Sequence, residues 1–215
     1  MKTPQDPLSL DFRIGEGLSR LAMAHRVDDW DRAKATGLNP TQLAILGLLE
    51  RRGETGLGVK EIAAQLGVSQ PTASDSINAL ERKEYVAKHP GMIDKRAVRV
   101  VLTTDGLAVI GQAGQENGLA TEALAALDAD EREDLLLTLI KMIRHLQETG
   151  AIPVQRMCVS CRYFAPFAHA DAARPHHCKF VDAAFGQREL RIDCRDHVEA
   201  DPSSRAATWD AFQTG

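Results

Sequence analysis

The sequence has no cysteine in its first 157 residues, no apolar run near the length of a membrane span, and few aromatic residues. A spanning helix needs about 20 consecutive apolar residues, and the N-terminal residues lack the apolar stretch of a signal peptide. We therefore expect a cytoplasmic protein. The 44% hydrophobic and 26% charged residues are typical of a globular fold and exclude a disordered or fibrous chain.

The chain also lacks an overall excess of positive charge, because its net charge is −4. This average disfavours a polyanionic partner, but charge is unevenly distributed along the chain. Residues 55–104 carry 7 basic and 5 acidic groups, whereas residues 105–150 carry 3 and 9. If the protein binds a polyanion, the only net-positive segment, 55–104, is where we expect the contact.

Apolar periodicity and capping signals predict four helices in the first 84 residues. Leu10, Ile14 and Leu18 recur at helical spacing within the first of them. Asn39 with Pro40 predicts the start of the second helix, and Ser69 predicts the cap of the fourth. The predicted helices cover residues 8–36, 40–52, 59–66 and 70–84. The last two, joined by a three-residue turn, form a helix-turn-helix.

A change of period from helical to alternating predicts a β-hairpin after residue 85. Val98, Val100 and Leu102 alternate with their neighbours, and Pro90-Gly91 supplies the turn. We then expect one helix over about 105–126 and another that begins at a capping box and ends near residue 150. Residues 154–200 show no sustained period, so their fold is expected to depend on something other than a hydrophobic core.

Two short motifs carry a family resemblance over about residues 8–149. The run Leu66-Gly67-Val68-Ser69-Gln70-Pro71-Thr72-Ala73-Ser74 and the pair Asp94-Lys95-Arg96 with Leu102-Thr103 resemble the MarR family of winged-helix transcription regulators. The resemblance implies a mainly α, winged helix-turn-helix (α+β) fold that binds double-stranded DNA as a homodimer through long helices. We divide the chain into a DNA-binding and dimerisation domain, 1–150, and a small irregular metal-stabilised C-terminal extension, 151–215.

Hydrogen-bonding side chains at the start of the fourth helix suit the edges of bases in the major groove. We predict base or phosphate contacts from this helix, and phosphate or minor-groove contacts from the hairpin. Asp75 would repel phosphate unless it accepts from a cytosine amino group or pairs with Arg96. A polar surface for a protein partner is the alternative. The predicted DNA-contacting residues are Ser69, Gln70, Pro71, Thr72, Ser74, Asp75, Asn78, Lys88, Lys95, Arg96 and Arg99.

All four cysteines, Cys158, Cys161, Cys178 and Cys194, fall within 37 residues. A reducing cytosol and the C-x2-C spacing favour a metal site over disulfides. Four thiolates suit a closed structural Zn²⁺ site, with His197 or His177 as alternative ligands. The sequence around Cys161 and Cys178 also resembles the high-potential iron–sulfur proteins, which implies a [4Fe–4S] cluster as the alternative cofactor.

These observations predict a sequence-specific DNA-binding regulator, a repressor, that catalyses nothing and whose C-terminal module senses metal or redox state. A first alternative is a regulator that responds to a small aromatic or lipophilic acid and has a purely structural zinc tail. A second, of another class, is a dithiol oxidoreductase that uses Cys158-x2-Cys161. A third is an interaction module that binds no DNA.

Overall fold

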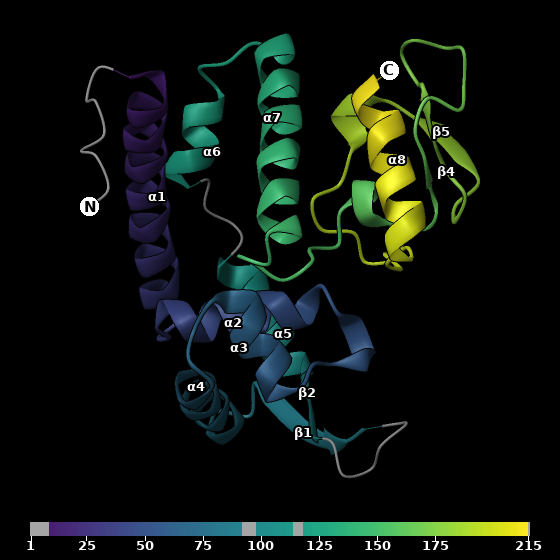
Figure 1. The fold of residues 1–215 in the computed structure, drawn as a ribbon. Coiled ribbons are helices and arrows are strands. Elements are labelled where there is room, and N and C mark those ends of the chain that lie inside the picture. Colours follow the sequence, from purple (N-terminus) through teal and green to yellow (C-terminus); the bar gives the residue numbers. More distant parts are fainter. Residues whose placement is uncertain (1–8, 92–97, 114–117, 215) are drawn as a thin grey trace, which may run out of the picture.

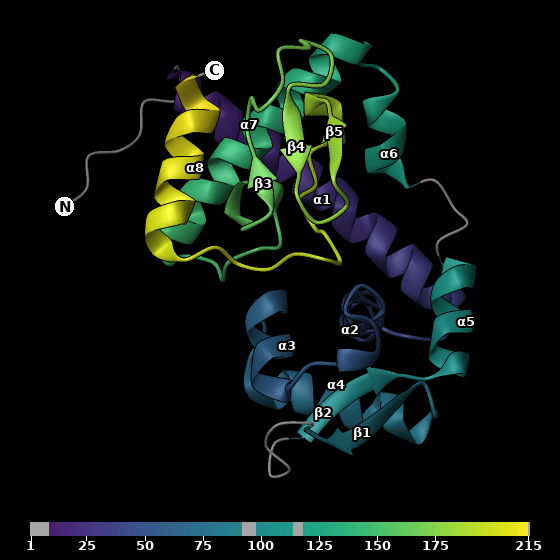
Figure 2. The same cartoon turned by 90° about the vertical axis from the view of Figure 1, so that its right-hand side faces the viewer.

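The computed structural model describes residues 9–91, 98–113 and 118–214. Two long helices, α1 and α7, stand above a winged part made of α2 to α5 and one hairpin, and a C-terminal module lies beside α7 (Figures 1 and 2). The helices are α1 Leu10–Ala35, α2 Pro40–Glu50, α3 Val59–Leu66, α4 Gln70–Arg82, α5 Thr104–Ala113, α6 Leu119–Leu124, α7 Ala129–Glu148 and α8 Pro202–Thr214. The strands are β1 Val86–Pro90, β2 Val98–Leu102, β3 Phe164–Ala165, β4 His176–Cys178 and β5 Ala183–Phe185.

The capping residues identified in the sequence start or end their helices as predicted. The Asn39 side chain accepts from the Gln42 N–H at 2.9 Å, and the Ser69 hydroxyl accepts from the Thr72 N–H at 3.2 Å. Gly67 ends α3 in the left-handed conformation, with φ +63°, which a glycine adopts without steric cost. These local signals therefore fix the helix-turn-helix formed by α3 and α4.

The winged part is held by one apolar core, in which α2 packs against α4 and α5. Ile45 and Leu49 of α2, Ile62 of α3 and Ile77 of α4 are fully buried there. The hairpin β1–β2 is antiparallel and pairs Val86 with Leu102. An isolated bridge from Leu57 to Val100 attaches β2 to the segment before α3. The hairpin is thereby fixed beside α4.

Two sequence predictions about this part are wrong. The helix expected over 105–126 ends at Ala113, and Gly118 is an extended N-cap that starts the separate helix α6. Pro90, expected in the turn of the hairpin, is the last residue of β1 and pairs with Val98. A proline is compatible with this place at the end of an edge strand, because its missing N–H removes no bond that the strand needs.

The C-terminal module is held by a hydrophobic core that it shares with α7, contrary to the expectation for residues 154–200. Met157, Val159 and Phe164 pack there with Trp209 and Phe212 of α8. Ile140 of α7 belongs to the same cluster, so this core crosses the domain boundary that we placed at residue 150. The three short strands form a sheet in the order β3-β4-β5. The sequence offered no period here because the strands span two or three residues each and aromatic contacts replace long elements.

Helix α1 leaves most of its apolar side chains exposed. Leu10 is 71% and Trp30 62% exposed, and Ala33 is its one buried residue in the single chain. Exposed apolar residues also lie on α6 and α7, among them Leu119 and Leu146. A helix with apolar groups around its circumference normally requires a partner. Within the described ranges, no helix is long and apolar enough to cross a bilayer.

The start of α5 gives a stability prediction. A Cβ at Gly106 would meet the Tyr85 carbonyl oxygen at 2.1 Å, whereas one at Gly111 in the same helix would meet nothing within 4 Å. We expect Gly106→Ala to lower the free energy of unfolding by about 1–3 kcal/mol through overpacking. Gly111→Ala, the control, should leave it unchanged or raise it by up to about 1 kcal/mol. Urea denaturation measures both; equal effects would contradict the close packing.

Candidate nucleic-acid interface and cysteine site

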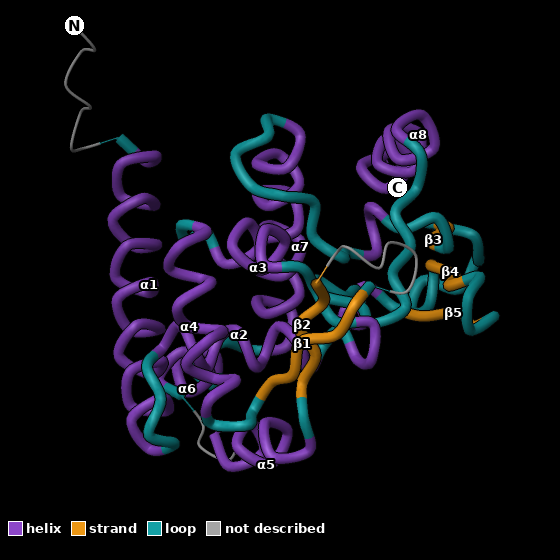
Figure 3. Tube along the Cα trace, turned by 90° about the horizontal axis from the view of Figure 1, so that it is seen from below, coloured by secondary structure: helices purple, strands orange, loops and turns teal. Residues whose placement is uncertain are grey.

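Helix α4 has one buried and one exposed face. Ala73, Ile77 and Leu80 point into the core of the winged part. The predicted DNA-contacting residues of this helix and its cap are exposed, except for the half-buried Ser74: Ser69, Gln70, Pro71, Thr72, Asp75 and Asn78. Figure 3 views the molecule from the end that carries α4 and the hairpin β1–β2, which lie side by side. The exposed face of α4 is therefore free to enter a major groove.

The hairpin is connected to α4 by a lysine. The Lys88 ammonium donates to Asn78 Oδ1 at 2.7 Å and pairs with Glu81 Oε2 at 2.6 Å. Arg99 on β2 pairs with Glu61 of α3, with 2.5 Å between Nη1 and Oε2. Both cations, predicted to contact phosphate, are thus held by carboxylates in the free protein. Exchange of these carboxylates for phosphate oxygens is compatible with such pairs, because exposed ion pairs contribute little.

Two further predicted contacts, Lys95 and Arg96, lie outside the described residues. The structure adds one candidate that the sequence reasoning missed, Arg82. It is exposed in the last turn of α4, four residues after Asn78 and on the same stripe of the helix as Asp75. The signal was its helical spacing from Asn78, which places a cation beside the predicted polar face.

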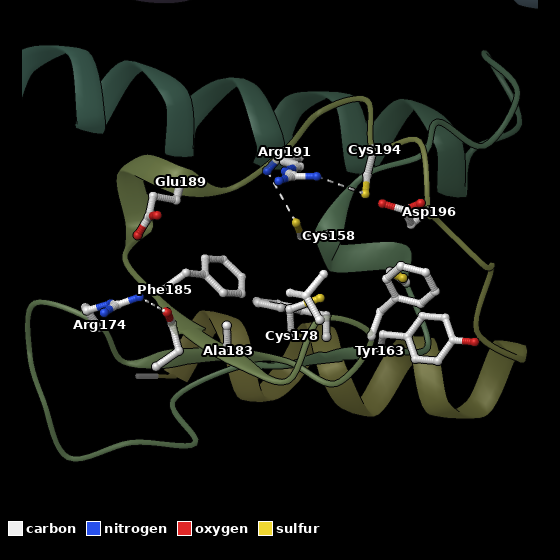
Figure 4. A pocket seen from close by; sticks show the side chains of 15 residues that line it. Cys158, Tyr163, Arg174, Cys178, Ala183, Phe185, Glu189, Arg191, Cys194 and Asp196 are labelled. Atoms are coloured by element: carbon white, nitrogen blue, oxygen red, sulfur yellow. Dashed lines mark hydrogen bonds between the residues drawn. The ribbon is translucent and has the colours of Figure 1, made fainter. Parts of the chain in front are cut away.

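The four cysteines line one cavity of about 200 Å³ in the C-terminal module. Cys158 begins a short 3-10 turn, Cys178 ends β4, and Cys194 lies in the loop before α8. Figure 4 shows these three side chains directed toward a shared space, with Phe185 and Tyr163 on either side. A shared cavity is compatible with the metal site expected from the spacing of the cysteines, and that site stays a prediction.

Two donors from one arginine reach the cysteine sulfurs. The Arg191 main-chain N–H donates to Cys158 Sγ at 3.3 Å, and its Nη1 donates to Cys194 Sγ at 3.7 Å (Figure 4). Burial nevertheless raises the pKa of the Cys158 thiol to about 11, with neighbouring thiolates adding to the effect. A dithiol oxidoreductase needs the opposite shift in the pKa of its attacking thiol. Cys158 is therefore poorly suited to be the attacking thiol of such an enzyme.

The two histidines named as alternative ligands interact elsewhere. His197 Nε2 lies 3.0 Å from the Ser160 hydroxyl, and burial lowers the pKa of its ring. His177 bonds to His169 at 3.1 Å and lies 3.2 Å from Asp182. Neither lines the cavity. Among the described residues, no three Cys, His, Asp or Glu side chains converge as one metal ion requires, so the zinc site stays a prediction.

The loop that contains Cys194 is bound to the winged part by three residues, Arg156, Asp193 and Arg195, which we call the latch. Asp193 accepts from Arg51 Nε at 2.5 Å and from Arg156 Nε at 2.8 Å. Arg156 also donates to the Arg51 carbonyl at 2.8 Å, and Arg195 donates to the Glu50 carbonyl at 3.2 Å. These carbonyls end α2, where cations are favoured by the helix dipole.

The latch places a cysteine ligand candidate between two residues that contact the winged part. The Cys194 N–H itself donates to the Arg156 carbonyl at 2.9 Å. Helix α2 in turn packs on α4 in the apolar core. The Cys194 loop is therefore connected to α4 through α2. Sequence reasoning missed the latch because its partners are over 100 residues apart.

Comparison with known proteins gives matches to one family. A family model described as the MarR family matches residues 36–97. YkoM of Bacillus subtilis, described as an uncharacterized HTH-type transcriptional regulator, is 30% identical over 137 residues, which cover 63% of this chain and 86% of YkoM.

Solved structures share the same fold. The MepR–DNA complex of S. aureus has a TM-score of 0.54 at 20% identity, covering 66% of this chain and 100% of MepR. CouR of Rhodococcus jostii RHA1, bound to p-coumaroyl-CoA, has a TM-score of 0.51 at 20% identity, covering 68% of this chain and 97% of CouR. Each of these matches leaves about a third of this chain uncovered.

Proposed function

The chain belongs to the MarR family of DNA-binding transcription regulators, and we propose that it acts as a homodimeric repressor controlled through its C-terminal module. Members of this family are regulators and not enzymes. The observation that carries the DNA-binding part is the exposed polar face of α4 beside the hairpin. Repression follows by occlusion, since a dimer seated on a promoter blocks access of polymerase to the same duplex.

Dimer formation is supported by the exposed apolar residues of α1, α6 and α7. A second copy would cover Leu10, Ile14, Leu18 and Leu21, which are 40–71% exposed in the single chain. Burial of such side chains contributes about 25 cal/mol per Å² of apolar surface. A two-fold dimer presents two copies of α4 about one turn of DNA apart, so the operator is proposed to be an inverted repeat.

Control through the C-terminal module is supported by the latch. Linkage requires that the signal stabilise one arrangement of the DNA-binding helices over another. The latch joins the loop of Cys194 to the C-terminus of α2, so that a metal centre held by the cysteines would bias the position of α2. We propose that the cysteine site senses the signal and that the latch transmits the resulting change to α2.

Recognition by α4 is tested with Asn78→Ala. The binding sequence is first selected from a random DNA library and then compared with single-base changes by gel retardation. Loss of one base contact should weaken operator binding by about 1–3 kcal/mol, roughly 5- to 150-fold, and relax the preference at one position of each half-site. Gln112→Ala on α5, an exposed amide, is the control. Unchanged preference in Asn78→Ala would remove this residue from the interface.

A second candidate signal is a small aromatic acid, and a hollow between α1 and α2 favours it. The hollow has a volume of about 430 Å³ and is lined by Arg26, Asp29, Trp30, Asn39, Pro40 and Thr41, so that an acidic side chain lies beside the arginine. An arginine beside an indole suits a carboxylate attached to a ring. In this alternative, operator affinity falls with added aromatic acid and is independent of the metal content of the protein. Gel retardation with increasing aromatic acid, carried out on metal-loaded and on metal-free protein, distinguishes the two signals.

A further inference from the structure

The size of the cysteine cavity determines which metal centre it suits. Zn–S bonds of about 2.3 Å place four thiolate sulfurs within about 4 Å of one another, with no space left between them. The cavity here has about 200 Å³, more than the roughly 150 Å³ that accommodates benzene. No three donors among the described side chains meet at the spacing of one ion. The cavity lined by the four cysteines is therefore larger than a single metal ion.

The walls of the cavity oppose contraction around a smaller ion. Cys178 is paired in β4 between Phe164 of β3 and Ala183 of β5. His176 beside it is fully buried among the rings of Phe164, Phe185 and Phe212. Moving the backbone of Cys178 would disrupt the sheet and this aromatic packing. The backbone of Cys178 is therefore fixed at the wall of the cavity.

The lining also matches the requirements of an iron–sulfur cluster. Tyr163, Phe164, Phe180 and Phe185 line the cavity, with Phe164 buried and Phe180 exposed. Apolar side chains around a cluster tune it and limit solvent access. The two Arg191 donors reach Cys158 and Cys194, and N–H···S bonds to ligand sulfurs stabilise the negative charge of a thiolate-bound cluster. The guanidinium adds a compensating positive charge.

From the volume of the cavity, its aromatic lining and the four cysteines that line it, we propose that Cys158, Cys161, Cys178 and Cys194 each ligate one iron of a [4Fe–4S] cluster. Only the regulatory role of this cluster rests on the function proposed above. The cavity is part of the single chain, so binding of a cluster does not depend on DNA. His177 and His197 are not ligands. The aromatic rings then surround the cluster, and the Cys194 ligand connects it to the latch.

The test uses the full chain purified without oxygen and, separately, the metal-free chain reconstituted with an iron salt and sodium sulfide. We expect about four irons and four sulfides per chain, a broad brown absorbance, and a Mössbauer spectrum of a cubane cluster. Two irons per chain, one zinc per chain with no iron, or a colourless metal-free protein after reconstitution would each overturn the proposal.

Variants assign the ligands. Cys178→Ser and Cys194→Ser should each lose at least half of the bound iron, while His177→Ala and His197→Ala should keep it and the brown absorbance. Circular dichroism checks that the serine variants fold. If they do not, the wild-type iron and sulfide content still decides. Loss of iron in the histidine variants alone would overturn the assignment. None of these readouts involves DNA, so failure here leaves the proposed DNA binding standing.

Discussion

A Leu18→Glu variant is expected to be monomeric and to lose at least about 100-fold in operator affinity. Leu18 lies on the exposed apolar stripe of α1, with Ile14 and Leu21 as its neighbours. A carboxylate buried in an apolar interface without a partner costs several kcal/mol. A monomer has one α4 and contacts one half-site, so the favourable free energy of the second half-site is lost. Analytical ultracentrifugation and gel retardation measure the two losses.

Arg20→Gln is the matched control for this variant. It makes the same change of net charge on the same helix, at an exposed residue paired with Glu16, and should leave the dimer and its operator affinity intact. A Leu18→Glu protein that remains dimeric with unchanged affinity would show that the apolar stripe of α1 does not form the interface. Urea denaturation distinguishes loss of the interface from loss of the fold.

The winged part was predicted from the sequence because its signals are local. Caps such as Asn39 and Ser69 and the left-handed Gly67 lie within a few residues of the ends that they determine. The break at Gly118 was missed because the apolar residues on both sides of it continue a helical period. The core of the C-terminal module was missed for a different reason. It brings Phe164 against Phe212, almost 50 residues later, and no periodicity encodes such contacts.

The candidate sites were predictable in part, and the difference again follows contact range. Helical spacing alone predicted the polar residues that α4 exposes, and the spacing of the cysteines led us to expect them around one site; they line one cavity. The ion pairs of Lys88 and Arg99 could not be predicted from spacing, because each pair joins two separate secondary-structure elements. The volume of the cysteine cavity could not be predicted from the sequence either. The spacing of the cysteines in the sequence indicates which residues are candidate ligands, whereas their positions in space depend on the packing of β4 and its neighbours.

An Asp193→Asn variant is expected to bind the operator with the same affinity whether its metal centre is present or removed. Asp193 joins Arg51 of the winged part to Arg156 of the module, and the amide removes the charge that holds both. Couplings between sites typically change affinity 5- to 150-fold, and the expected ratio in the variant falls to about one. Gel retardation with loaded and metal-stripped protein measures the ratio for wild type and variant.

Asp193 is the residue before Cys194, so its substitution could act on the cysteine loop itself. The contact between Asp193 and Arg51 is therefore also broken by a substitution of Arg51. Arg51→Ala removes the side-chain partner at the end of α2 without altering the cysteine loop, and should lower the ratio toward one with the metal content unchanged. Glu199→Gln, which breaks an ion pair with Arg205 inside the module, should preserve the ratio. If wild-type protein binds DNA equally in both states, control through the latch is wrong, although DNA binding and the cluster remain. If only Asp193→Asn loses the ratio, the residue acts on the ligand loop and not across the contact with α2.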